Sequence, residues 1–270
     1  MRLGGFVIHG NDVDTLGACL DSLAAVCDEV VTVDSGALDG SRQLAVSRGA
    51  RIVELPWQGY GAARQAAVQA LDGCDYVFYL DSDERLAPEG VAGLKRWKTS
   101  ANHRPSERLW LRDWVELGRR CFEFRRSTKA RLMERRLANW RPEMIVHESL
   151  GLPKTPPLDV CIEHRFFSPV TRRAEKDERY AWLWALKSYA EGRHGVAWGR
   201  RVAHAVKNLL MEGALWRGGL QALEVAWAAA RYHQRKYERL KQFELGWFDE
   251  AVAAYRAGDY RAVFRFAQKS

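Results

Sequence analysis

The sequence lacks the cysteine pattern and the long apolar runs that mark several classes of protein. Its five cysteines are odd in number and scattered, without a CxxC pair, which argues against a disulfide framework or a zinc site and favours a reducing cytoplasm. No run approaches the roughly 18 apolar residues that a membrane-spanning helix needs. The first apolar stretch is too short for a signal peptide. We therefore expect a soluble or peripheral protein of the cytoplasm.

Charge is unevenly distributed along the chain. Residues 1–170 carry 23 basic and 23 acidic side chains, which cancel, whereas residues 171–246 carry 15 basic against 8 acidic side chains. A positive excess of this kind favours a negatively charged partner, either nucleic acid or an anionic membrane surface. We expect any such partner to contact the C-terminal third.

The first part of the chain alternates short strand-like runs with helical patterns. Strands are predicted for "RLGGFVIH", "EVVTVDSG", "ARIVELP" and "YVFYL", and the segments between them have apolar residues at helical spacing. This alternation predicts a parallel, doubly wound α/β sheet. After Trp97 the strand-like "RLWLRDWVELG", "KARLMERRLANW" and "LDVCIEHRFF" predict an antiparallel annex to the sheet.

Three regions follow from these patterns. We predict an α/β domain with its annex over residues 1–170. A basic helical extension is predicted over 171–246, and a terminal helical pair over 247–270. The terminal pair resembles half of a tetratricopeptide hairpin, but a single unit cannot bury the face of a solenoid.

Acidic residues follow two of the predicted strands at the point where each strand ends. Asp34 closes "VVTVD", and Asp81 and Asp83 follow "YVFYL". In open α/β sheets, ligands bind beyond the carboxyl ends of the strands. Residues two apart in extended chain point the same way, so Asp81 and Asp83 can face one ligand, and carboxylate oxygens suit Mg²⁺ or Mn²⁺. The alternative is that these acids, Glu84 included, cap the next helix.

The whole stretch from "EVVTVDSGALDGS" through "GYGAARQAA" to "YLDSDERL" closely resembles the nucleotide-sugar half of family-2 glycosyltransferases. Those enzymes have the GT-A fold, bind a nucleoside diphosphate sugar, and use a DxD motif with a divalent cation. The likeness is closest to the bacterial lipopolysaccharide-core glucosyltransferase branch. The segments "RLMERR", "VHE" and "RYHQRKYERL" occupy the places of that branch's later motifs, and the resemblance covers roughly residues 1–242.

The resemblance implies a role for residues at the nucleotide. Asp34 should meet the base, expected to be uracil, and Asp39 should shape the same loop. Arg64 matches a basic position that steadies the nucleotide or diphosphate, with a solvated helix face as the alternative. Asn11 is retained in "HGND", where Asp12 replaces the family's Glu. The shorter Asp12 side chain leaves its family contact open.

The resemblance also implies the metal ligands and the catalytic base. Asp83 should ligate a Mg²⁺ or Mn²⁺ ion that bridges the diphosphate, with Asp81 near the ribose or metal and His147 as a further contact. Inverting transfer needs a base for the acceptor hydroxyl, and Glu148 is the first candidate; its alternative is a surface salt bridge. Asp113 is the second candidate for the base. His164 is either a further diphosphate or metal contact or a satisfied core residue.

We therefore expect an inverting, metal-dependent hexosyltransferase that moves a sugar such as glucose from a UDP-type donor to a lipid-linked glycan acceptor such as lipopolysaccharide core. It would act at the inner face of the bacterial cytoplasmic membrane. Tryptophans among the basic C-terminal helices fit peripheral attachment to anionic lipid or, equally, a helical core. Nucleic acid is not expected, because no binding motif accompanies the charge.

Two other functions remain open from the sequence. A nucleotidyltransferase would usually need a Gly-rich, Lys-bearing loop after the first strand, and "HGNDVD" does not supply one. A non-catalytic scaffold that binds a nucleotide sugar or glycan is disfavoured by the intact set of Asp34, Asp81 and Asp83. The altered "HGND" slightly favours it.

Overall fold

A computed structural model describes the chain except for residues 118–119, 147–148, 167–169, 196–198, 212–213 and 270. The chain divides into two compact units. The first comprises Met1–Asp113, Arg126–Arg141 and Glu148–Arg165, and the second comprises Trp114–Arg125, Pro142–His147 and Phe166–Ser270. The far end of one hairpin and a short segment after it thus belong with the C-terminal helices rather than with the sheet.

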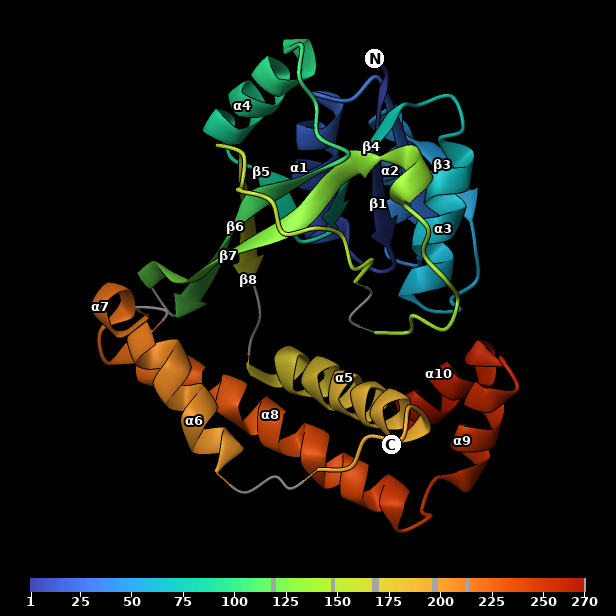
Figure 1. The fold of residues 1–270 in the computed structure, drawn as a ribbon, viewed down its shortest axis with the longest axis vertical. Helices are drawn as coiled ribbons and strands as arrows, with labels where there is room; N and C mark the ends of the chain where they lie inside the picture. Colours follow the sequence, from blue (N-terminus) through green and yellow to red (C-terminus); the bar gives the residue numbers. More distant parts are fainter. Residues whose placement is uncertain (118–119, 147–148, 167–169, 196–198, 212–213, 270) are drawn as a thin grey trace. The chain divides into compact units, whose positions relative to one another are not determined.

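The sheet has the strand order β3-β2-β1-β4-β7-β6-β8-β5 (Figure 1). The strands are β1 (Leu3–His9), β2 (Glu29–Asp34), β3 (Arg51–Glu54), β4 (Tyr76–Asp81), β5 (Glu84–Leu86), β6 (Ser106–Leu117), β7 (Arg120–Glu134) and β8 (Cys161–Phe166). β3, β2, β1 and β4 pair in parallel, whereas β4–β7 and β5–β8 pair antiparallel. The predicted parallel α/β sheet with an antiparallel annex is confirmed.

The parallel strands are covered by helices on both faces. The helices of the first unit are α1 (Val13–Ala24), α2 (Ser41–Ser47), α3 (Tyr60–Ala70) and α4 (Pro88–Thr99), with a short 3₁₀ turn η1 (Arg135–Leu137). A Cβ on Gly4 would lie 2.9 Å from Leu71, just after α3, and one on Gly5 would lie 2.7 Å from Cys27, just after α1. Neighbouring strand residues face opposite sides, so α3 and α1 flank opposite faces of β1.

An aromatic cluster anchors β1 and β4 beneath the edge where the acids lie. The ring centroids of Phe6 and Tyr79 stack 5.3 Å apart, and Trp140 meets both rings edge-on at 5.9 and 5.3 Å. Phe6 and Trp140 are fully buried. Their packing holds β4 in place along β1 and so sets the position of the acids at the carboxyl end of β4.

The expectation that Glu84 caps a helix is wrong. Glu84 begins β5, a short strand that separates "YVFYLDSD" from the next helix, and its side chain is buried. α4 begins only at Pro88, and no side chain caps it. The acids after β4 are therefore held by the sheet rather than by a helix N-terminus.

The second unit is mainly helical. Its helices are α5 (Val170–Ala190), α6 (Arg200–Val206), one π-helical turn η2 (Lys207–Met211), α7 (Ala214–Gly218), α8 (Gln221–Glu244), α9 (Asp249–Arg256) and α10 (Tyr260–Lys269). Its core includes Trp182, whose ring meets those of Phe243 and Phe248 at 5.2 and 5.7 Å. Among the described helices, none is long and apolar enough to cross a membrane.

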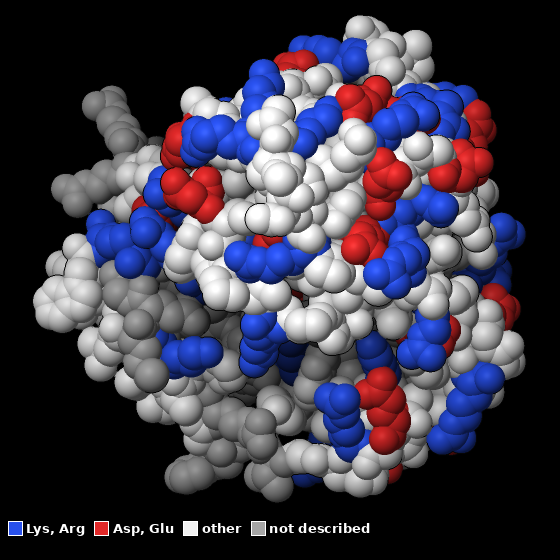
Figure 2. All heavy atoms as spheres, turned by 45° about the horizontal axis from the view of Figure 1, so that its top comes forward, with Lys and Arg blue, Asp and Glu red and all other residues white. Residues whose placement is uncertain are grey.

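The surface charge agrees with the cancelling charges of residues 1–170. Figure 2 shows basic and acidic side chains interspersed over much of the face that it draws. Among the charged side chains of the first unit, Arg51 pairs with Glu29 and Arg85 with Glu163. The face therefore offers no large field of one sign for a polyanion.

Candidate active site

The parallel register brings the acidic strand ends to one edge of the sheet. Ile8 of β1 pairs with Asp81 of β4, and His9 pairs with Asp34 of β2. Because the three strands run the same way, the loops that follow them all leave at this edge. The side chains at this edge come from segments far apart in sequence.

Two loops at this edge are joined by side-chain hydrogen bonds. The Asn11 side-chain oxygen accepts from the Leu38 amide at 2.7 Å, and Asp39 Oδ2 accepts from the Val13 amide at 3.0 Å. Desolvation acts to raise the pKa of Asp39, but hydrogen bonds, chiefly from Ser41, outweigh it and lower the pKa below its ordinary value. The loop after β1 and the loop after β2 therefore form one frame.

Asp34 shapes the second of these loops from within. Its Oδ1 accepts hydrogen bonds from the amides of Gly36 and Ala37 at 2.9 and 2.8 Å. Gly36 has φ 101°, in the left-handed region that favours glycine. The nucleotide contact expected of Asp34 stays a prediction, and the structure gives the side chain a clear role in the loop.

The carboxylate of Asp81 forms ion pairs with two buried arginines. Its Oδ1 lies 3.1 Å from a terminal nitrogen of Arg64, and its Oδ2 lies 2.9 Å from one of Arg131. Both guanidinium carbons lie 4.5 Å from the ring centroid of Tyr79, within range of cation–π attraction. Desolvation acts to raise the pKa of Asp81, but the charges of Arg131 and Arg64 hold it well below its usual value.

Glu84 completes this charge cluster from β5. It pairs with Arg131, and its Oε2 accepts a hydrogen bond from the Asp81 amide at 3.0 Å. Burial raises the pKa of Glu84 to about 7. Arg131 thus pairs with both carboxylates, and its contact with Glu84 is buried, where a charge without a partner costs several kcal/mol.

A second chain of charges holds Asp83. Asp83 Oδ2 lies 3.3 Å from His164 Nε2, and His164 Nδ1 lies 2.9 Å from Oδ1 of Asp113. Burial acts to lower the pKa of His164, but the hydrogen bonds to Asp113 and Asp83 raise it to about 10. Asp113 is only 1% exposed, so its contact with His164 fixes the imidazole from the protein interior.

Asp83 and His164 fit a divalent cation as a pair. Proteins commonly orient a metal-binding histidine by a carboxylate on its other ring nitrogen, and Asp113 occupies that position. Within the described ranges, no cluster of three or more His, Cys, Asp or Glu side chains could enclose a metal. Mg²⁺ is commonly held by one or two carboxylates together with substrate phosphates and water. The pair would fit a cation of that kind once the cation displaces the Nε2 proton that the raised pKa of His164 retains, with further ligands from water or a bound phosphate.

The structure brings many of the predicted site residues together and adds one. Asp81, Asp83, Arg64, His164 and Asp113 belong to the two charge chains. Asn11, Asp34 and Asp39 lie in the loops after β1 and β2. The predicted His147 and Glu148 lie outside the described residues. Arg131 was not predicted, and the only sequence signal for it was the basic strand "RLMERR".

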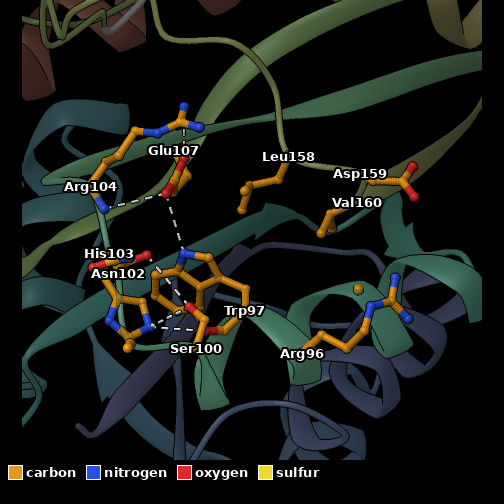
Figure 3. A pocket seen from close by; sticks show the side chains of 12 residues that line it. Arg96, Trp97, Ser100, Asn102, His103, Arg104, Glu107, Leu158, Asp159 and Val160 are labelled. Carbon is orange, nitrogen blue, oxygen red and sulfur yellow. Dashed lines mark hydrogen bonds and ion pairs between the residues drawn. The ribbon is translucent and has the colours of Figure 1, made fainter.

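A separate cavity of about 640 Å³ lies beside the C-terminal end of α4 (Figure 3). Some of its polar groups contact one another: the Trp97 indole donates to Glu107 at 3.3 Å, and His103 Nε2 lies 2.9 Å from the Trp97 carbonyl oxygen. Arg104 pairs with the same Glu107. These contacts close the end of α4, and none involves the acids that follow β4.

The N-terminal part of the chain matches a known family. Residues 6–97 match the model of "Glycosyl transferase family 2". The lipopolysaccharide core biosynthesis glycosyltransferase LpsC of Rhizobium meliloti is 38% identical over 93 residues, which cover 32% of this chain and 33% of LpsC. An uncharacterized glycosyltransferase of Rickettsia felis is 28% identical over 88 residues, 33% of this chain and 31% of the relative. The chain thus spans about a third of the length of these curated relatives.

Solved structures include a similar protein. Glucosyl-3-phosphoglycerate synthase from Mycobacterium tuberculosis, in complex with Mn²⁺, UDP and phosphoglyceric acid, is 23% identical with a TM-score of 0.33 and covers 44% of each chain. The family match and the parallel order β3-β2-β1-β4 agree with the GT-A fold expected from the sequence.

Proposed function

Because residues 6–97 belong to glycosyl transferase family 2, we propose that the chain is an inverting glycosyltransferase that moves a hexose from a UDP-type donor to a lipid-linked glycan. The observation that carries this proposal is the placement of Asp81 and Asp83 at the carboxyl end of β4, with arginine on one carboxylate and histidine on the other. A charge cluster with a purely structural role would need only balanced charges. This cluster also contains Asp81 and Asp83, the acids to which the family resemblance gives a donor-binding role.

The donor's nucleotide lies, in this proposal, on the frame formed by the loops after β1 and β2. Asn11 and Asp39 join these loops, and Asp34 sets the shape of the second. Arg64 and Arg131 would face the diphosphate. Arginine suits that task because its planar donors match phosphate oxygens, and both side chains already lie over Tyr79.

In this proposal Asp83 and His164 would hold a divalent cation, Mg²⁺ or Mn²⁺. A cation bound there would offset the negative charge of the departing diphosphate. Asp113 holds His164 in the orientation that aims Nε2 at Asp83. Asp81 is assigned to positioning the arginines, since each of its carboxylate oxygens already contacts one of them.

Glu148 stays our candidate for the base that takes the acceptor hydroxyl proton. Asp113, the other candidate, is 1% exposed and hydrogen-bonded to His164. A base must reach the proton that it takes, so we assign Asp113 to positioning instead. Glu148→Gln with unchanged turnover would exclude Glu148 as the base.

The acceptor is proposed to be a lipid-linked glycan such as lipopolysaccharide core, used at the cytoplasmic face of the inner membrane. The support is the 38% identity to a lipopolysaccharide core glycosyltransferase, over a third of its length. The match covers the donor side of the chain, so the acceptor is inferred from the relative's role.

The direct experiment measures nucleoside diphosphate release from a panel of sugar donors, with and without Mn²⁺ or Mg²⁺. We expect release from a UDP-sugar that chelation abolishes and that Asp83→Ala lowers by at least about a hundredfold, since the cation contact is lost. The control is Asp75→Ala, an exposed acid at the opposite end of β4. Full activity of Asp83→Ala would overturn the metal assignment. Donor binding without turnover on any acceptor would favour a non-catalytic scaffold.

A further inference from the structure

Two exposed rows of large apolar side chains lie on the helices of the second unit. Trp216 on α7, Leu220 just before α8, and Leu223 and Trp227 on α8 are 80%, 81%, 42% and 51% exposed. On α6 and η2, Val202, Val206 and Leu210 are exposed as well. Within α8, Leu223 and Trp227 are four residues apart, a spacing that puts helical side chains on one face. We call Trp216, Leu220, Leu223 and Trp227 the tryptophan row.

The opposite face of α8 explains why these side chains point outward. Ala222, Val225 and Ala226 are buried, and they pack against Val115, Phe122 and Phe124 of the hairpin end. This inner face is made of small residues, so the helix lies close to the hairpin and leaves its large side chains on the other side. The tryptophan row is therefore separate from the face by which α8 packs in its own hydrophobic core.

α7 is fixed so that Trp216 faces away from the hairpin. The neighbouring Arg217 donates to the carbonyl oxygens of Glu123 and Phe124 at 2.6 and 3.0 Å. A Cβ on Gly218 would lie 2.3 Å from the ring of Phe122, so only glycine allows this approach. With Arg217 and Gly218 held against β7, the preceding Trp216 is directed to solvent.

The tryptophans of this region therefore divide into two kinds. Trp182 is fully buried, and Trp184 packs against Tyr237. Trp216 and Trp227 are exposed, and Trp198 lies outside the described residues. The first pair fits the helical-core interpretation of the sequence, and the second pair does not.

Charge around the row favours one kind of partner. Residues 171–246 carry 15 basic against 8 acidic side chains, and the exposed Arg217 and Arg231 lie next to or one turn from its tryptophans. Tryptophan with basic neighbours on an amphipathic helix is typical of peripheral contact with a membrane interface. Nucleic acid would instead need a basic groove with base-contacting side chains.

We propose that the tryptophan row inserts into the surface of an anionic membrane and so docks the enzyme where its acceptor is anchored. The acceptor part rests on the proposed function, whereas membrane docking can be tested without it. The indoles and leucines would enter the headgroup region, and Arg231 would meet anionic headgroups.

The test is co-sedimentation of the full chain with vesicles of phosphatidylcholine alone or mixed with phosphatidylglycerol. We expect at least about tenfold more protein on the anionic vesicles at low salt, with the difference reduced at high salt. Trp216→Ser with Leu220→Ser should lower that binding about tenfold or more, because two interfacial anchors are lost. Both sites are exposed, so the fold should be retained.

Trp247→Ser is the matched control, because Trp247 is 64% exposed but lies beyond the C-terminal end of α8, outside the row. Its vesicle binding should equal that of the unchanged chain. Equal binding to both kinds of vesicle, or unchanged binding by the double variant, would overturn the proposal. A dimer in light scattering that the double variant converts to a monomer would assign the row to a second copy instead.

UDP binding measured by calorimetry separates this proposal from the proposed function. The double variant should bind UDP as the unchanged chain does, since the row contains none of the donor residues. A chain that binds vesicles but neither UDP nor any sugar donor would support the docking surface and contradict the proposed function. A chain that binds UDP but no vesicles would support the donor site and contradict the docking surface.

Discussion

Asp113 and His164 meet through a 2.9 Å contact between Oδ1 and Nδ1, on the side of the imidazole away from Asp83. The contact joins β6 to β8, and β8 pairs with β5 immediately after the DSD acids. Through these pairings the annex reaches the carboxyl end of β4. The position of Asp83 therefore depends on strands far from it in sequence.

Asp113→Asn tests this relationship. The amide keeps the size of the side chain but loses the charge that holds the imidazole, and loss of such an orienting partner typically costs about 10- to 100-fold in metal affinity or activity. We expect the Mn²⁺ concentration needed for half-maximal donor turnover to rise by a factor of this size. Glu107→Gln is the matched control, because Glu107 is equally buried but contacts Trp97. Equal loss in both variants would mean that Asp113 acts only through stability.

Arg131 offers a second prediction, on stability. Arg131→Met leaves the carboxylates of Asp81 and Glu84 close together without their shared cation. Breaking a buried ion pair by removing one partner costs about 3–5 kcal/mol. We therefore expect a loss of this order in the free energy of unfolding by urea.

The pairing of Arg131 with Glu84 can be isolated by a double-mutant cycle. Glu84→Gln in the Arg131→Met background should recover part of the lost stability, because it removes the uncompensated charge. Arg64→Met is the comparison, and we expect it to cost less, since Arg64 pairs with Asp81 alone of these two acids. Simple additivity of Arg131→Met and Glu84→Gln would contradict the assigned pairing.

The parallel half of the fold could be predicted because its signals are local. Runs such as "EVVTVD" and "YVFYLD" are continuous and apolar, and helical spacing separates them. β5 could not be predicted in this way. Its three residues "ERL" have no period of their own, and they form a strand only because β8 pairs with them.

The site was predictable only where a motif carried it. Asp34, Asp81 and Asp83 follow strands and match a family pattern, whereas Arg131 is one basic residue among several in β7. Its place depends on register: β7 pairs Leu132 with Phe78, which brings Arg131 beside Tyr79. A register of this kind is set by tertiary packing and cannot be taken from spacing.

Asp39 tests whether the two nucleotide-side loops act as one frame. Asp39→Ala removes its bonds to Val13 and Ser41 and leaves the Asn11–Leu38 and Asp12–Ser41 bonds to join the loops. We expect UDP affinity to fall roughly tenfold, in proportion to one or two lost hydrogen bonds. Calorimetry with UDP measures this. Asp21→Ala is the control, because Asp21 is an exposed acid on α1. Unchanged UDP affinity in Asp39→Ala would show that the two loops do not act as one frame.

Lys236 gives a pH-dependent prediction in the second unit. Burial lowers its pKa to about 8, although its Nζ lies 4.4 Å from the Tyr232 ring centroid and 5.2 Å from that of Trp184. An unfolded lysine has a pKa of about 10.4, so the unfolded chain binds more protons between about pH 8 and pH 10. Stability should therefore rise with pH through that window.

Lys236→Met should remove this dependence. Methionine keeps the length of the side chain without the charge, so we expect the free energy of unfolding near pH 7 to rise by about 1–3 kcal/mol. The gain should shrink as the pH rises from about 8 to 10, because Lys236 is then neutral in the folded chain while the unfolded lysine approaches its own pKa of about 10.4. Lys241→Met, at an exposed position of the same helix, is the control and should change little at any pH. Urea unfolding of both variants across this range measures the effect, and a constant gap between Lys236→Met and the unchanged chain would mean that the charge of Lys236 carries no such cost.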